Sequence, residues 1–231
     1  MAFDFKSAEE VQDYLKNLSI EYRFGCYKEN NPEACHLLGD YLEAIDKDYK
    51  KAVKLFEKNC DSHNFPKSCL KFANFVALGK GIENPDQRKA LRYYNKACEL
   101  GEMTACYRAG VLTILDSGSP NSKLDCKQGL GLLEKACNNG NAEACHHLSG
   151  MYLEGFEPAK ILKDMKKAHD FATKACDLNN IYSCANLSIM YKKGDGIEAN
   201  MEISKKYKAK AEELKAEMRQ EIKFQEGIKP V

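Results

Sequence analysis

Large apolar residues recur along the chain at spacings of three, four and seven positions, which places them on one face of a helix. Adjacent pairs such as Leu55 with Phe56 and Tyr93 with Tyr94 lie in the middle of these segments. A half-buried strand would instead alternate apolar and polar residues with a period of two, and no sustained run of that kind occurs. The pattern therefore predicts an all-α protein.

The apolar segments form two sets of helices that alternate along the chain. The first set is predicted at 32–44, 66–78, 103–115, 142–154 and 181–193. The second set is predicted at 48–60, 86–99, 125–138, 164–178 and 201–222. Ser7 and Glu10 form a capping box that predicts a further helix near the N-terminus. Each consecutive pair makes a helical hairpin of about 34 to 39 residues.

Ten of the eleven cysteines recur with the period of these hairpins. They form five couples, whose members are 9, 9, 8, 8 and 8 positions apart: Cys26 with Cys35, Cys60 with Cys69, Cys98 with Cys106, Cys137 with Cys145, and Cys176 with Cys184. The first members of the couples follow one another after 34, 38, 39 and 39 residues. Such regularity is the sequence signature of a repeat array.

The residues around the couples repeat as well. A Lys-Ala pair precedes the first cysteine in three units, as in Lys96-Ala97 and Lys174-Ala175. A small residue follows the second cysteine by four positions in every unit, where we expect a neighbouring backbone to come close: Gly39, Ala73, Gly110, Ser149 and Ser188. Glycine ends three of the predicted first helices, as a helix C-terminus favours: Gly79, Gly155 and Gly194.

These motifs resemble the Sel-like repeat, a relative of the tetratricopeptide repeat with a longer and less regular period. The likeness covers nearly the whole chain and implies an α/α solenoid of about five hairpins stapled by disulfides. Its units would be a helical leader at 1–31 and repeats at 32–65, 66–102, 103–141, 142–180 and 181–231, the last ending in a capping helix. On that helix Leu214, Met218 and Ile222 share an apolar face, with charge on the other. The segment between Asp116 and Asp125 departs from the regular pattern and lengthens the third loop.

Two cysteine-rich branches of this family are candidates. One holds secreted proteins of the Helicobacter type, and the other holds mitochondrial assembly factors of cytochrome c oxidase. Residues 8–11, 26–29 and 40–43 resemble the leader of the second branch. The N-terminus lacks the apolar core of a secretory signal, which disfavours the first branch, and Asp4, Glu9 and Glu10 argue against a basic presequence.

Composition narrows the location and the class of partner. The chain of 231 residues carries 35 basic and 34 acidic residues, so it lacks the charge of a nucleic-acid binder. No apolar run reaches the roughly 18 residues that cross a bilayer, so no membrane span is expected. Eleven cysteines are many for a reducing cytosol. Together with the resemblance, they favour the mitochondrial intermembrane space, where oxidation traps small proteins.

Each cysteine couple is interpreted as a disulfide between one hairpin and the next. Residues eight apart in one helix lie about 12 Å apart, whereas a disulfide needs α-carbons within about 7 Å. A turn must therefore separate the two members, and Gly101, Gly140 and the pair Asn179-Asn180 supply helix breakers there. Metal binding is the alternative, but zinc sites usually bring cysteines two to four apart into groups of four.

Cys126 stands outside the couples. It lies near the start of the predicted helix 125–138, where the helix dipole favours a thiolate. One interpretation is a reactive thiol that exchanges with a client disulfide or ligates a metal or haem. The other is a spare cysteine, half-buried in a helix.

The histidines are weaker candidates for a metal or haem site. There are five: His36, His63, His146, His147 and His169. His36 follows Cys35, and His146 with His147 follows Cys145, but adjacent helix residues point about 100° apart and do not readily share a ligand. We therefore predict no metal site and no cofactor, with haem as the open alternative.

No acid–base pair or nucleophilic triad emerges, so no catalytic residue is assigned and the chain is interpreted as a non-enzyme. The resemblance implies a monomeric scaffold that holds protein clients during cytochrome c oxidase assembly. It also implies an import oxidoreductase of the intermembrane space as a partner. A thiol-disulfide reductase or haem-handling factor acting on copper-chaperone clients is the first alternative, although a Cys-x-x-Cys motif is missing. A secreted repeat protein of the Helicobacter type is the second.

Overall fold

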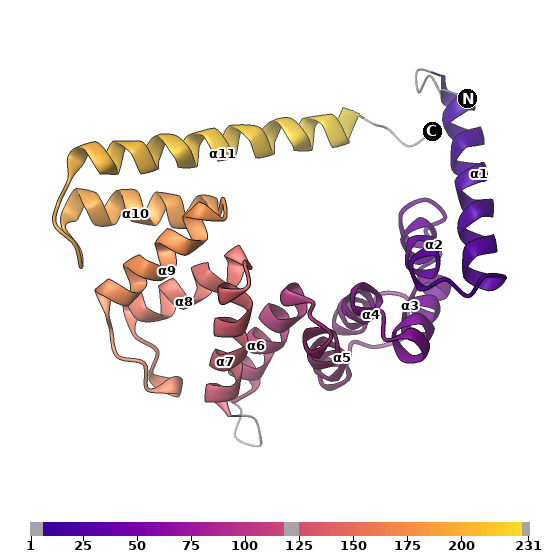
Figure 1. The fold of residues 1–231 in the computed structure, drawn as a ribbon, viewed down its shortest axis with the longest axis horizontal. Helices are drawn as coiled ribbons and strands as arrows, with labels where there is room; N and C mark the ends of the chain where they lie inside the picture. The colour runs from indigo at the N-terminus through magenta and orange to yellow at the C-terminus, as the bar shows by residue number, and fades with distance from the viewer. Residues whose placement is uncertain (1–6, 118–124, 228–231) are drawn as a thin grey trace. The chain divides into compact units, whose positions relative to one another are not determined.

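The computed structural model describes residues 7–117 and 125–227, and the lengthened third loop of the sequence analysis lies largely outside them. The described residues form helices joined by short loops, with one isolated β-bridge between Phe156 and Ile161 and no strand (Figure 1). The helices are α1 Ala8–Tyr27, α2 Pro32–Ala44, α3 Tyr49–His63, α4 Pro66–Leu78, α5 Gln87–Glu99, α6 Met103–Ser117, α7 Cys126–Asn138, α8 Ala142–Glu154, α9 Met165–Asp177, α10 Ile181–Lys193 and α11 Met201–Gly227, with a 3-10 turn at Glu157–Ala159.

The all-α prediction is confirmed, and each predicted helix corresponds to an observed one. The first helices of the hairpins are α2, α4, α6, α8 and α10, and the second helices are α3, α5, α7, α9 and α11. The largest differences lie at C-termini, where α3 continues to His63 and α11 to Gly227. Several helices end at a glycine or asparagine in the left-handed region, as at Gly79, Gly194 and Asn64, so the sequence marks where they stop.

Helix starts follow a rule that differs between the two sets. The side chain of an asparagine caps three first helices, and that of an aspartate caps four second helices, in each case by accepting a hydrogen bond from the backbone of the first turn. The asparagines are Asn31, Asn141 and Asn180, and the aspartates are Asp48, Asp86, Asp125 and Asp164. Two helices depart from this pattern, because α4 begins after Phe65 without a side-chain cap and α11 is capped by Asn200. Each such cap stabilises its helix by about 1 kcal/mol. The caps therefore help to fix where these helices begin.

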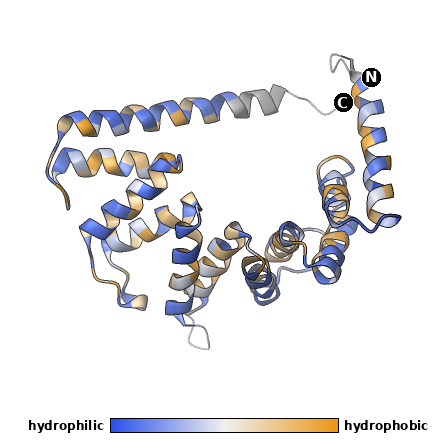
Figure 2. Ribbon diagram, viewed as in Figure 1, coloured by the Kyte–Doolittle hydropathy of each residue, from blue (hydrophilic) through white to orange (hydrophobic). Residues whose placement is uncertain are grey.

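The chain forms two compact units, which divide between Ala105 and Cys106, within α6. In the first unit, each helix from α1 to α5 packs on the next one along the chain. In the second unit, the helices from α7 to α11 do the same. Every helix carries both polar and apolar residues (Figure 2), and the apolar ones form the contacts between neighbours. Among the described helices, none is both long and apolar enough to span a bilayer.

The small residues after the second cysteines do allow close packing, in three different ways. Gly39 leaves room for the ring of Phe56, so here a side chain and not a backbone fills the space. A side chain on Gly110 would meet the carbonyl oxygen of Gly129 on α7. Ser149 donates a hydrogen bond of 2.8 Å to the carbonyl oxygen of Ala168 on α9. First and second helices of a hairpin are therefore packed tightly at this position.

Candidate functional site

Disulfides join the end of one hairpin to the start of the next. Four have α-carbon separations of 4.5 to 4.8 Å: Cys26–Cys35 between α1 and α2, Cys60–Cys69 between α3 and α4, Cys137–Cys145 between α7 and α8, and Cys176–Cys184 between α9 and α10. Cys98 and Cys106 are disulfide-bonded as well. Positive φ angles at Gly140 and Asn179 reverse the chain between two of these couples. The ten cysteines thus staple helices together.

The remaining cysteine, Cys126, is the first residue of α7 and carries a free thiol. Its side chain is only 6% exposed. The thiol is therefore largely shielded from a disulfide of another protein. Its position at a helix N-terminus is as predicted, but its burial makes it a poor site for exchange between proteins.

Histidines prove to be contacts between hairpins. The Nδ1 atom of His36 on α2 lies 3.1 Å from the hydroxyl of Ser68 on α4. Asn59 on α3 donates to the same hydroxyl at 2.7 Å and to the carbonyl oxygen of Pro32 at 2.8 Å. His36, Ser68 and Asn59 are all buried. Burial lowers the pKa of His36, more than Asp40 raises it, so the ring is neutral at neutral pH.

The same contact recurs between α8 and α10. Here the Nδ1 atom of His146 lies 2.8 Å from the hydroxyl of Ser183, and burial again lowers the histidine pKa. Each histidine directly follows the second cysteine of its repeat, and each serine directly precedes the second cysteine of the next. Where Leu70 and Tyr107 replace the histidine, Ala105 and Ala144 replace the serine, respectively. This correlated pattern was present in the sequence and could have revealed the contact.

The other histidines lie apart from one another. His169 contacts the hydroxyl of Tyr191 at 3.2 Å, His147 packs on the ring of Tyr107, and His63 borders a small hollow beside Cys26. His146 and His147 also border an open hollow of about 290 Å³. Within residues 7–117 and 125–227, no three side chains of the histidine, cysteine, aspartate or glutamate type cluster as metal ligands would.

The Lys-Ala motif joins successive second helices. Lys96 on α5 donates to the carbonyl oxygen of Cys60 at 2.9 Å and to the carboxylate of Asp61 at 3.2 Å. Lys174 on α9 donates to Asn138 at 3.2 Å, and Lys210 on α11 lies 4.0 Å from Asp177. In each case the lysine reaches the residue that follows the cysteine of the preceding second helix. The motif is therefore structural.

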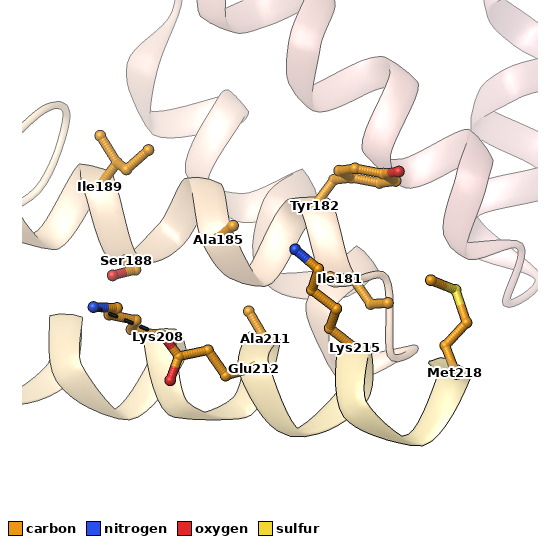
Figure 3. Close-up of a pocket in the computed structure, with 10 residues that line it drawn as sticks. All are labelled: Ile181, Tyr182, Ala185, Ser188, Ile189, Lys208, Ala211, Glu212, Lys215 and Met218. Carbon is orange, nitrogen blue, oxygen red and sulfur yellow. Dashed lines mark ion pairs between the residues drawn. The ribbon is translucent and has the colours of Figure 1, made fainter. Parts of the chain in front are cut away.

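The last hairpin carries an apolar groove. A groove of about 490 Å³ runs between α10 and α11 (Figure 3). Its lining residues are Ile181, Tyr182, Ala185, Ser188 and Ile189 on α10, and Lys208, Ala211, Glu212, Lys215 and Met218 on α11. Tyr182 is 69% exposed, Ile189 50% and Met218 44%. The chain thus presents a connected apolar surface to solvent, of the kind that binds other molecules.

Charged residues line the groove on its α11 side. Lys208 forms an ion pair of 3.7 Å with Glu212, and Lys215 lies one turn further along the helix (Figure 3). With one acidic and two basic residues among those that line it, the groove carries a net positive charge. It therefore favours a ligand with an apolar face and at least one acidic group.

Beneath the groove, α10 and α11 pack closely against each other. Ala211 and the partly buried Leu214 pack on a cluster that includes Leu187 and Met190 of α10. The hydroxyl of Ser204 on α11 donates a hydrogen bond of 2.7 Å to the carbonyl oxygen of Ser188. The sequence predicts a capping helix whose apolar face includes Leu214 and Met218. Leu214 packs inward as expected, whereas Met218 lines the exposed groove.

The fold and the spacing of its motifs define a protein of the helical-repeat class, and sequence comparison specifies which. The Sel1 repeat model matches residues 32–63, 69–102, 104–141, 142–180 and 181–214, so the chain belongs to the Sel1 repeat family. A solved Sel1 repeat protein from Oxalobacter formigenes has the same fold, with a TM-score of 0.71 at 20% identity over 92% of this chain and 83% of that one.

Within that family, the chain is similar to proteins named cytochrome c oxidase assembly factor 7. It is 46% identical to the Drosophila melanogaster homolog over 119 residues, which are 51% of this chain and 45% of the relative. It is 35% identical to the human protein over 125 residues, which are 51% of this chain and 54% of the relative. The chain thus spans about half the length of the relatives it matches.

Proposed function

We propose that this chain is a non-enzymatic scaffold that supports assembly of cytochrome c oxidase, the terminal complex of the respiratory chain. The observation that carries the proposal is the 46% identity to a relative named for that process. Structure supports the scaffold part of the proposal in two ways. Ten cysteines form staples between helices, and the remaining thiol, Cys126, is buried. The exposed groove between α10 and α11 offers a binding surface instead.

The proposed location is the mitochondrial intermembrane space. Disulfides persist in oxidising compartments and are rare in the cytosol. A chain whose hairpins are joined by disulfides would be trapped there once an oxidoreductase has formed them. The import oxidoreductase is therefore a proposed partner, beside the protein clients of oxidase assembly. Fractionation tests the location: rupture of the outer membrane alone should release the protein, and a cytosolic protein unaffected by that rupture would contradict it.

The scaffold and thiol-exchange hypotheses differ in what they require of Cys126. Cells that lack the protein should have reduced oxidase activity, and Cys126→Ser should restore it fully. Cys137→Ser removes a staple instead and should restore less, in proportion to lower protein abundance. The measurement is oxidase activity alongside protein level in the same cells. If Cys126→Ser accumulates normally yet fails to restore activity, the thiol-exchange hypothesis replaces the scaffold.

A further inference from the structure

Contacts between successive hairpins show which positions of one hairpin pack against the first helix of the next. His36, one residue after Cys35, contacts the hydroxyl of Ser68 on α4. Asp40, five residues after Cys35, forms an ion pair of 2.9 Å with Lys71 of α4. On the second helix, the residue before the cysteine is Asn59, which also contacts Ser68. The cysteine itself, Cys60, is bonded to α4.

The last hairpin has residues at all four of these positions. One and five residues after Cys184 stand Ala185 and Ile189. Glu212 occupies the place of the second-helix cysteine, because Lys210-Ala211 repeats the Lys-Ala motif, and Ala211 therefore corresponds to Asn59. All four residues line the groove between α10 and α11. The groove is therefore the surface on which a further first helix would pack.

These positions differ between junctions, and at that of α6, α7 and α8 they are apolar: Tyr107, Val111 and Ala136. Histidine, aspartate and asparagine occupy three of them at the junction of α2, α3 and α4, where the neighbouring helix belongs to the same chain. The last hairpin has Ala185, Ile189 and Ala211 there instead. Two small residues leave room for an incoming backbone, and the exposed Ile189 and Tyr182 border that room. The last hairpin thus has the residue types that receive a first helix elsewhere in the chain.

We propose that the groove binds an amphipathic α-helix of a partner protein, seated as the first helix of a sixth hairpin would be. The first helices α4, α8 and α10 are each 13 residues long, which sets the length of helix that the surface fits. The two lysines of the lining favour an acidic helix. This inference rests on the proposed function only in taking the partner to be a client of the scaffold.

The position of Glu212 allows a direct test by disulfide trapping. The probe is a synthetic peptide copy of residues 141–154, an acidic first helix whose Cys145 already bonds to the preceding second helix. Its Cys145 is supplied as a mixed disulfide with thionitrobenzoate. In protein carrying Cys126→Ser, the thiolate introduced by Glu212→Cys should attack that disulfide, release thionitrobenzoate and become bonded to the peptide at least tenfold faster than the thiolate introduced by Glu213→Cys. Both glutamates are exposed, so neither substitution disturbs the core. The control differs only in the direction of the side chain, because adjacent helix residues point about 100° apart.

The apolar part of the groove is tested in the same assay. Adding Ile189→Glu to the Glu212→Cys protein should slow trapping at least tenfold, whereas Leu162→Glu, on a residue that is 84% exposed and outside the groove, should leave it unchanged. Equal trapping at positions 212 and 213, or no effect of Ile189→Glu, would overturn the proposal. So would faster coupling of the Glu212→Cys protein to itself than to the peptide, because the occupant would then be a second copy.

This assay does not depend on oxidase assembly. A normal level of oxidase in cells lacking the protein would overturn the proposed function and leave the trapping result standing. Failure to trap the peptide, with oxidase lost in those cells, would overturn the groove as a docking site and leave the proposed function standing.

Discussion

The junction of α2, α3 and α4 and the exposed end formed by α10 and α11 use the same positions of the repeat for opposite purposes. At the junction, His36 and Asn59 are buried against Ser68, and Cys60 is bonded to the next hairpin. At the exposed end, Ala185, Ala211 and Glu212 stand in the corresponding places and border a groove. A polar pair occupies the surface that α4 covers, and mostly apolar side chains line the groove between α10 and α11.

This difference has a physical reason. A buried hydrogen-bonded pair is favourable only when both partners are always present, because an unpaired buried group costs about 1 to 3 kcal/mol. Within the chain, the next hairpin always supplies Ser68 to His36. An external partner comes and goes, so the surface that receives it is better built from residues that tolerate solvent when free and contribute apolar area when covered. The exposed end has that character.

The largest expected effect comes from the cysteine position. Cys60→Ser opens a disulfide that closes a loop of about nine residues, which should lower the free energy of unfolding by about 2.5 kcal/mol in the chain-entropy model. At the corresponding place in the exposed end, Glu212→Ser should change it by less than about 0.5 kcal/mol, as for most surface substitutions. Urea denaturation followed by circular dichroism compares the two. Equal losses of unfolding free energy would show that the repeat position of Cys60 contributes no more at the junction than the position of Glu212 does at the groove.

The next effect concerns the polar pair at the junction. His36→Leu and Ser68→Ala should each destabilise the first unit, because each leaves a buried group unpaired. The double substitution reproduces the residue types found at Leu70 and Ala105 and should recover part of the loss. A double-mutant cycle should therefore give a coupling of about 1 kcal/mol. Strictly additive losses would mean that the contact of 3.1 Å contributes nothing of its own.

The smallest expected effect is a dependence of stability on pH. Burial lowers the pKa of His36 below its ordinary 6.5, against the opposing effect of Asp40 and with Lys71 and Lys67 acting in the same direction. The unfolded chain therefore takes up a proton first as the pH falls, so the unfolding free energy is highest above pH 6.5 and declines below it until the folded ring also titrates. Urea titrations between pH 7.5 and about 5 should show this decline. The protein carrying both His36→Leu and Ser68→Ala should show a smaller decline in unfolding free energy. An identical decline would exclude His36 as its source.

The sequence predicted the helices well because their ends carry explicit signals. Gly79 and Gly194 stop first helices, and an aspartate such as Asp86 begins second ones. The positions of the cysteines within the period indicated which helices adjoin, and the disulfides of the structure lie between those helices. Such signals act within a few residues of the helix end and do not depend on tertiary contacts, so they can be interpreted from a single sequence.

The side-chain contacts between hairpins were harder to predict, because they depend on which faces meet. His36 and His146 were considered as ligands, whereas each contacts a serine hydroxyl of the next first helix. The correlated residues stand in the sequence, but the structure was needed to show that these two faces meet. The groove was missed for a related reason. Met218 has the spacing of a core residue on α11, yet it is 44% exposed because it borders the groove and not the packed face.

The central claim is that the apolar surface between α10 and α11 carries the scaffold's activity, and rescue of cells lacking the protein tests it most directly. Ile189→Glu and Leu162→Glu place the same charge on exposed residues of the same unit, one inside the groove and one outside it. Oxidase activity should be measured at matched protein abundance. We predict that Leu162→Glu restores activity as the unmodified protein does, whereas Ile189→Glu accumulates normally and restores little. Full restoration by Ile189→Glu would contradict the claim.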